Sequence, residues 1–391
     1  MAAELSALAT IWEEQDALAN CRKANGLDLK NIITETEVVK KEARKNLFAK
    51  LTASGGNRRK RALVEITCEL LHTLGSTTAD VLTSSQLSGL AKDEFTDCAT
   101  MLGKLKTFDQ SQWSSLANLA VKHWGNVDSW DRNKINDLRG IVSGLSVDNI
   151  KKLQLTTIDV ASAIGNHGNW DDAAKLTAAF NEWLKDSKSN DLTTITGNEL
   201  RLIGELVCGA STDQITQIPQ NAYMTAVKEV GAARTCIGQQ WTHYAQKALA
   251  GYGADTSSWT LDKTKLIGNV IGGLPKDNIK QMTRAQIQQI TPATITKIPN
   301  INFCGFTAEQ FAWFSVNQAS SVTMGQLAGL EKDQSDALKE VMAEVNDYYY
   351  YYDSDDDEGN KGGNSSSGNH GNLMLILAVM VTGLVTIGYL G

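Results

Sequence analysis

The sequence lacks the residue groupings on which most catalytic and metal sites depend. Its histidines are scattered, with no second histidine at metal-ligand spacing, and no Cys-x-x-Cys occurs. A Gly-x-Ser-x-Gly nucleophile turn and a phosphate-binding loop are absent as well. We therefore expect a protein that is not an enzyme and that has no cofactor and no bound metal.

Basic charge, proline and strand-type patterning are also scarce. The 391 residues include 37 Lys and Arg against 44 Asp and Glu, a net charge of −7 that argues against a general nucleic-acid binder. Only four prolines occur, and the strand-favouring residues are scattered instead of alternating. Because helix formers dominate, we expect an all-α body.

Six cysteines are too few for a disulfide framework in a chain of this length. Cys68 and Cys98 are 30 residues apart, and Cys208 and Cys236 are 28 apart. Either pair could bridge adjacent helices in a secreted protein, whereas buried free thiols are expected inside the cell. The sequence alone does not fix the connectivity.

The carboxyl terminus has the pattern of a glycosylphosphatidylinositol attachment signal. Residues 373–390 form an uncharged apolar run, and small polar residues precede it at 362–372. We predict lipid attachment at Asn364, with Gly362, Gly363 and Ser365 as alternatives. The run is also long enough for a retained membrane-spanning helix. A buried core helix is a third, weaker interpretation.

The amino terminus gives no matching sign of secretion. Residues 1–20 have no basic start and no continuous apolar stretch, so they do not form a secretory signal. We interpret the chain as the carboxyl-terminal part of a longer precursor. The alternative is a tail anchor that inserts after translation.

Two polar segments flank the body of the chain. Residues 1–54 are expected to be helical, and a glycine-containing linker at 55–61 holds four cations that suit a processing protease, although a nuclear-import patch or a solvated helix start would look similar. These cations are Arg58, Arg59, Lys60 and Arg61. Residues 347–372 are expected to form a disordered acidic stalk whose tyrosines suit sulfation. The alternative is a solvated spacer without modification. The tyrosines are Tyr348, Tyr349, Tyr350, Tyr351 and Tyr352.

The body, residues 62–346, repeats itself at about 65 residues. Aspartates recur at 80, 148, 213 and 277, spaced by 68, 65 and 64 residues. Periodic self-similarity of this kind indicates stacked supersecondary units. We expect a right-handed α-solenoid of four to five units.

Each unit has its own expected capping and core residues. An apolar helix ends at a glycine that suits the left-handed C′ position, at Gly144, Gly209 and Gly273. Ser146 suits an N-cap, and Pro275 suits a first turn. A longer helix with a buried aromatic anchor closes the unit, around Trp113, Phe180, Trp183, Trp241 and Phe311.

These features together resemble the mesothelin, stereocilin and otoancorin family. The resemblance rests on the Leu-Ile-Gly repeats, the Ile298–Phe306 segment, the basic site and the anchor signal, and it covers roughly residues 62–391. It implies an armadillo-like superhelical solenoid, cleavage after Arg61, and a lipid anchor on the extracellular face of the plasma membrane. It also implies adhesion to a mucin-type glycoprotein or an extracellular matrix or gel. The alternative function is an intracellular, tail-anchored helical-repeat scaffold.

Overall fold

The computed structural model describes residues 66–352, with side chains through residue 343. Every regular element in this range is an α-helix or a short 3-10 segment, written η, and none is a strand. The all-α expectation is therefore confirmed. The expected segments at 1–54, 55–61 and 373–391 lie outside the described residues.

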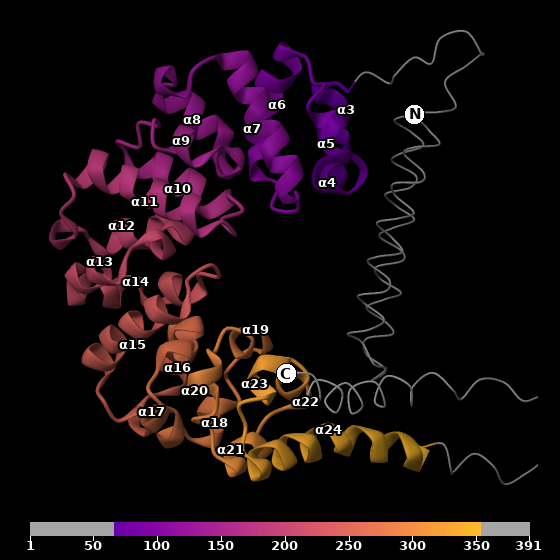
Figure 1. The fold of residues 1–391 in the computed structure, drawn as a ribbon, viewed down its shortest axis with the longest axis vertical. Helices are drawn as coiled ribbons and strands as arrows, with labels where there is room; N and C mark the ends of the chain where they lie inside the picture. The colour runs from indigo at the N-terminus through magenta and orange to yellow at the C-terminus, as the bar shows by residue number, and fades with distance from the viewer. Residues whose placement is uncertain (1–65, 353–391) are drawn as a thin grey trace, which may run out of the picture. The chain divides into compact units, whose positions relative to one another are not determined.

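The helices follow one another in chain order, so each packs mainly on elements close to it in sequence (Figure 1). The first elements are α3 (Cys68–Leu74), η1 (Gly75–Thr77), α4 (Thr78–Val81), α5 (Ser84–Leu87) and α6 (Lys92–Lys104). The last is α24 (Lys332–Tyr352), which continues beyond residue 346, where the sequence predicts the body to end. Contacts divide the chain into two units, and the first of them ends at Met342.

One order of elements occurs three times in the middle of the first unit. A long helix is followed by a short 3-10 turn, a short helix, a six-residue 3-10 segment and another short helix. The first set is α7 (Gln110–Trp124), η2 (Val127–Ser129), α8 (Arg132–Leu138), η3 (Arg139–Gly144), α9 (Val147–Ile150) and then α10 (Ile158–His167). The second is α11 (Ala173–Lys188), η4 (Leu192–Thr194), α12 (Gly197–Leu202), η5 (Gly204–Gly209), α13 (Thr212–Gln217) and then α14 (Gln220–Ala232). The third is α15 (Gly238–Tyr252), η6 (Thr256–Ser258), α16 (Leu261–Ile267), η7 (Gly268–Gly273) and α17 (Lys276–Gln281).

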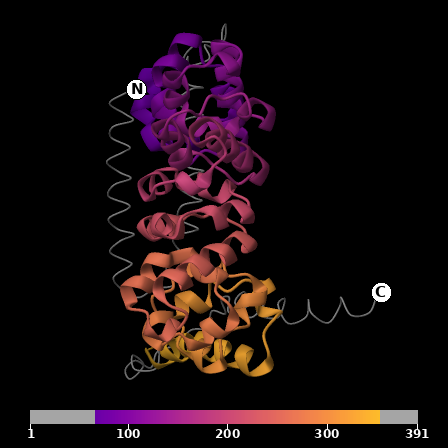
Figure 2. The same cartoon turned by 90° about the vertical axis from the view of Figure 1, so that its left-hand side faces the viewer.

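The packing of these three sets is also the same. Each long helix (α7, α11 or α15) lies against the six-residue 3-10 segment that comes after it in the chain. The helices α6, α8, α10, α12, α14 and α16 form a second series in which each packs on the next (Figure 2). Each set thus covers the apolar face of its neighbour, as stacked units must.

The segment from residue 284 to residue 327 differs from the sets before it. It holds six helices of four or five residues and no long helix, so the long helix expected around Phe311 is wrong. Their bounds are α18 (Arg284–Ile287), α19 (Pro292–Ile295), α20 (Asn300–Phe303), α21 (Ala308–Ala312), α22 (Val316–Ala319) and α23 (Met324–Leu327). Phe311 is nevertheless fully buried in α21, where it packs on Phe303, Phe306 and Phe314.

The expected core aromatics and the Ser146 N-cap are confirmed, whereas Pro275 lies one residue earlier than expected. Trp113, Trp183 and Trp241 on the long helices are at most 1% exposed. Ser146 is the N-cap of α9 and accepts a hydrogen bond from a backbone N–H of the first turn. Pro275 is the N-cap residue of α17, one position before its first turn.

The left-handed conformation expected at Gly144, Gly209 and Gly273 is wrong. None of the three has a positive φ. Each ends a six-residue 3-10 segment, and a Cβ atom there would overlap a backbone carbonyl oxygen of the long helix against which the segment packs. These glycines are therefore required by close helix packing, not by backbone conformation.

Positive φ occurs instead at the first residue of the same three segments. Gly204 has φ 55° and Gly268 has φ 46°, values that glycine adopts without a steric penalty. The corresponding residue of the first set is Arg139, with φ 47°. Arg139 thus has a positive φ at a position where the two equivalent repeats have glycine.

Candidate functional site

Seven buried glutamines, three on long helices and four on short ones, join the start of their helix to the chain roughly thirty residues earlier. Each glutamine is the third residue of its helix. Its amide oxygen accepts a hydrogen bond from the backbone N–H of the residue three positions earlier. Its amide nitrogen then donates to two backbone carbonyls, or three for Gln310; for Gln318 they lie 31 and 28 residues earlier. The seven glutamines are Gln112, Gln240, Gln286, Gln310, Gln318, Gln326 and Gln334.

Five of these glutamines lie on carboxyl-terminal helices that begin at a regular interval. The helices α18 to α24 begin at residues 284, 292, 300, 308, 316, 324 and 332, always eight residues apart. A Thr or Ser N-cap precedes α18, α19, α21, α22 and α23 and accepts a backbone N–H of the first turn. We call the series of buried glutamines and their backbone contacts the glutamine ladder. It provides hydrogen-bond partners for buried polar groups at helix ends that would otherwise be unpaired.

This ladder of glutamine contacts was not predicted from the sequence. Its signal is the pattern Thr/Ser-x-x-Gln, which begins at Thr283, Thr307, Ser315 and Thr323. The pattern is a capping box, but a capping box does not say whether the glutamine is buried. The fixed interval of eight residues is the part of the signal that could have indicated a repeating contact.

Two disulfides tie elements about thirty residues apart. Cys68 on α3 is bonded to Cys98 on α6, and Cys208 in η5 is bonded to Cys236, which lies just before α15. These are the two pairs that the spacing had offered. Cys304 is a free, partly exposed thiol, and Cys21 lies outside the described residues.

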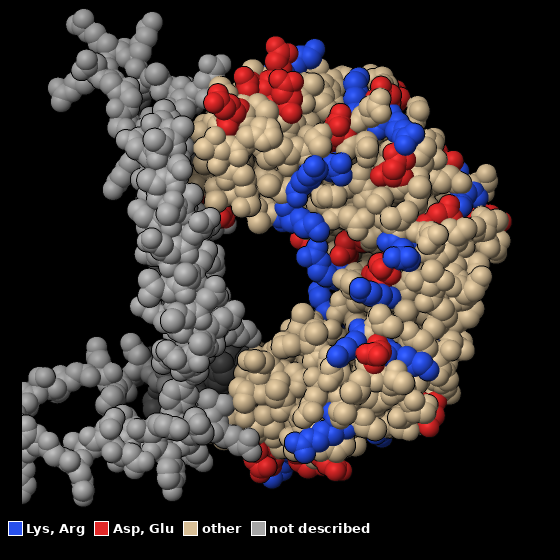
Figure 3. Space-filling model, turned by 180° about the vertical axis from the view of Figure 1, so that it is seen from behind, with Lys and Arg blue, Asp and Glu red and all other residues tan. Residues whose placement is uncertain are grey.

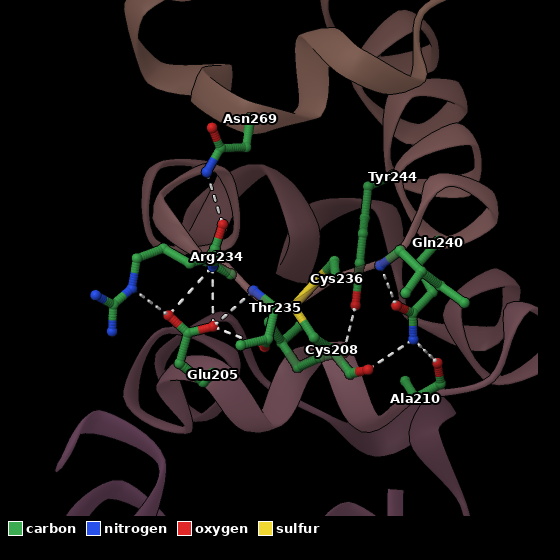
Figure 4. Close-up of a disulfide and its surroundings, with 12 residues drawn as sticks. Glu205, Cys208, Ala210, Arg234, Thr235, Cys236, Gln240, Tyr244 and Asn269 are labelled. Carbon is green, nitrogen blue, oxygen red and sulfur yellow. Dashed lines mark hydrogen bonds and ion pairs between the residues drawn. A yellow bond between two sulfur atoms is a disulfide. The ribbon is translucent and has the colours of Figure 1, made fainter. Parts of the chain in front are cut away.

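The second disulfide sits in a dense hydrogen-bond network (Figure 4). The Glu205 carboxylate accepts hydrogen bonds from the backbone N–H groups of Arg234 and Thr235 and from both of their side chains. On the other side, the hydroxyl of Tyr244 donates to the carbonyl of Val207 at 2.9 Å, and burial raises the pKa of this hydroxyl well above its usual range. The loop that carries Cys236 is therefore fixed on both sides.

A partly buried ion pair performs a similar role between α11 and α12. Lys188 lies 2.5 Å from Glu199, which also completes the capping box of α12 with Thr196. Burial alone would raise the pKa of Glu199, but hydrogen bonds from Lys188 and Thr196 outweigh it, and the pKa lies below its usual value. Glu199 is thus held as a carboxylate.

The described residues hold one grouping with metal-ligand types, and it is occupied by a covalent bond. The sulfur atoms of Cys68 and Cys98 and a ring nitrogen of His72 lie within 4.8 Å of one another. The two sulfurs are bonded to each other, so neither is a free thiolate.

Most of the modification sites that the sequence predicts lie outside the described residues. This applies to Arg58, Arg59, Lys60 and Arg61, and to Gly362, Gly363, Asn364 and Ser365. Tyr348 to Tyr352 belong to the last turns of α24, where only the backbone is described. Within residues 66–352, no helix is both long enough and apolar enough to cross a membrane.

Together these features define a class of protein, an all-helical scaffold whose helices are joined by backbone-bonding glutamines and two disulfides. The homologues of the chain, otoancorin and stereocilin, are members of the mesothelin-like family. The resemblance inferred from the sequence is thereby confirmed. No protein-family model matches the chain.

The similarity to these relatives is low in identity and partial in coverage. Otoancorin of Mus musculus is 24% identical over 255 residues, which is 65% of this chain and 22% of that protein. Otoancorin of Homo sapiens is 22% identical over 253 residues, with the same two shares. Stereocilin of Mus musculus is 24% identical over 258 residues, 65% of this chain and 14% of that protein. The chain thus spans less than a quarter of the length of these relatives.

Proposed function

We propose that this chain belongs to a non-enzymatic adhesion protein of the cell surface, which binds a mucin-type glycoprotein or a matrix polymer through its helical surface. The observation that carries the proposal is the pair of disulfides, because such bonds form and persist in oxidising, extracellular compartments. The family likeness supports the same compartment.

We further propose that residues 62–346 form a right-handed, armadillo-like superhelix of about 65-residue repeats. Support comes from the three successive sets with one order of elements. The same glycine contact, at Gly144, Gly209 and Gly273, recurs in each set. A superhelix of this kind presents a long continuous surface, which suits binding to an extended partner.

Sequence patterns alone support the proposed processing. We propose cleavage after Arg61, lipid attachment at Asn364, and an acidic stalk at 347–372 with sulfated tyrosines. The lipid would hold the protein on the outer face of the plasma membrane, and the stalk would carry the helical unit away from the lipid surface.

The test uses cells that express the full-length protein with a tag in the helical unit. Antibody to the tag should label intact cells, and phosphatidylinositol-specific phospholipase C should release the label. Thiol labelling of the denatured protein without reduction should leave Cys68, Cys98, Cys208 and Cys236 unmodified.

Two results would contradict the proposal. Labelling only after permeabilisation, with all four cysteines reactive, would favour the tail-anchored intracellular scaffold. Surface label that resists the phospholipase would leave the adhesion role but refute the lipid anchor in favour of a spanning helix.

A further inference from the structure

Arg139 has a backbone conformation that is normally adopted only by glycine. Its φ and ψ of 47° and −118° match the 46° and −122° of Gly268 at the equivalent position of the third set. The second set has Gly204 there, with φ 55°. A long side chain in this conformation is strained, and strained residues concentrate at functional sites.

Two further helix ends converge on this arginine. A Cβ atom built on Gly103, near the end of α6, would lie 3.0 Å from the Cβ of Arg139. A Cβ atom built on Gly140 would lie 2.6 Å from the carbonyl oxygen of His167, at the end of α10. Because Gly103 is followed by Lys104 and, two residues on, by Lys106, three cations and a histidine meet where α6, α8 and α10 end.

These cations have no anionic partner in the part of the chain that the structure describes. Lys104, Lys106 and Arg139 form no ion pair within residues 66–343. The Nε atom of Arg139 is buried and has no hydrogen-bond partner. An unpaired buried donor costs free energy, so Arg139 is both strained and under-bonded at this position.

The nearby acids are engaged elsewhere. Asp137, also on α8, accepts a hydrogen bond from Thr100 at 2.9 Å, and Asp159 on α10 pairs with Arg132 at 2.7 Å. Burial lowers the pKa of His167, and the positive charges of Arg139, Lys106 and Lys104 lower it further, against a hydrogen bond to the Ala163 carbonyl that raises it. The charges that lower the pKa of His167 are thus all positive, although the whole chain is acidic.

Figure 3 shows Lys and Arg side chains gathered along one edge of the helical stack, with fewer acidic side chains among them. A surface on which basic side chains outnumber acidic ones attracts a flexible polyanion, and screening by salt weakens the attraction. Arginine contributes more than charge, because its planar fork of donors matches the oxygens of an oxyanion in a bidentate contact.

We propose that Lys104, Lys106 and Arg139 form a binding site for the sulfate groups of an anionic extracellular polysaccharide. This inference rests on the proposed function, which places the helical unit against a matrix polymer or a glycoprotein. The Arg139 guanidinium contacts one sulfate group directly. The two exposed lysines, which are free to move, attract the groups that come next along the polymer.

The test compares the full chain, with its disulfides intact, against Arg139→Gly. This variant places glycine where the equivalent positions already have it, so its melting temperature should be unchanged or higher. The probes are a chondroitin sulfate chain and the same chain after chemical desulfation, with binding measured by calorimetry at two salt concentrations. We expect Arg139→Gly to weaken binding of the sulfated chain roughly tenfold or more, as loss of a hydrogen bond to a charged group does.

Two further variants test whether binding depends on the proposed site or only on the net charge of the protein. Lys104→Gln combined with Lys106→Gln should also weaken binding and should reduce its salt dependence. The control, Arg201→Gln, removes one cation that is already paired with Glu229, and it should bind like the parent chain.

Three outcomes would overturn the inference. The first is Arg139→Gly binding as tightly as the parent chain. The second is equal binding of the desulfated chain, and the third is tighter binding to phosphatidylserine vesicles than to the polysaccharide. Because these measurements use purified protein, they can fail while the surface labelling of cells still succeeds, so failure of the site is distinguishable from failure of the proposed function.

Discussion

The glutamine ladder makes a sharp prediction for Gln286. This side chain is 2% exposed, and its amide nitrogen donates to the carbonyls of Thr256 and Trp259 at 2.8 and 2.7 Å. Its amide oxygen accepts from the backbone N–H of Thr283 at 2.7 Å. Gln286→Met keeps the length and approximate volume of the side chain but removes both functions.

The magnitude can be worked out from the groups that lose their partners. The carbonyls of Thr256 and Trp259 belong to buried residues, and each unpaired buried acceptor costs about 1–3 kcal/mol. The N–H of Thr283 lies on an exposed residue and can bond to water instead. We therefore expect the free energy of unfolding to fall by about 3 kcal/mol.

The assay is urea unfolding monitored by circular dichroism, with native-state hydrogen exchange at the amide of Thr283 as a local measurement. The matched control is Gln288→Met, two residues away on the exposed side of the same turn, which should change stability by less than about 0.5 kcal/mol. Equal destabilisation by the two substitutions would refute the ladder as a source of stability. So would unchanged exchange at Thr283.

Three other perturbations test other contacts. Gly273→Ala should destabilise by at least about 2 kcal/mol in thermal unfolding, since the new Cβ would overlap a carbonyl of the neighbouring helix, whereas Gly89→Ala, with only ordinary contacts, should be nearly neutral. Replacing Cys208 and Cys236 by serine should lower stability by about 3.6 kcal/mol from the loop of 28 residues that the bond closes, and a loss below about 1 kcal/mol would contradict this. Glu199→Gln should cost stability at neutral pH, and its difference from the parent should shrink as pH falls below 4.5, because a carboxylate with a lowered pKa contributes above its unfolded value and loses that contribution on protonation. A difference that stays constant down to pH 3 would rule out the carboxylate as its cause.

The sequence was informative where a residue type has one main structural use. The large aromatic side chains expected on the long helices had to be buried, and Trp113, Trp183 and Trp241 are at most 1% exposed. Helix formers without alternation left no other fold class than all-α. The capping role of Ser146 could be read because a serine before an apolar turn satisfies the free N–H groups at a helix start.

The sequence misled where one residue type has two uses. Gly144 could be glycine for its backbone freedom or for its lack of a side chain, and only packing against α7 shows that the second applies. The burial of Gln286 could not be predicted from the local sequence, because its partners lie about thirty residues earlier in the chain. Arg139 gave no signal at all, since its strain depends on a backbone conformation that the neighbouring repeats reveal only by having glycine.

The interval of eight residues between the helices α18 to α24 limits how this part of the chain can change in length. Each glutamine must meet carbonyls at a fixed distance behind it, 31 and 28 residues for Gln310, Gln318 and Gln326. Insertion of one residue at position 305 would separate all three from their acceptors at once. Insertions within residues 283–331 should therefore be tolerated only as whole units of eight residues, each a short helix with its connection. Earlier in the chain the separations differ, at 33 and 30 residues for Gln112 and 32 and 30 for Gln240, so the connections there can vary by a residue or more.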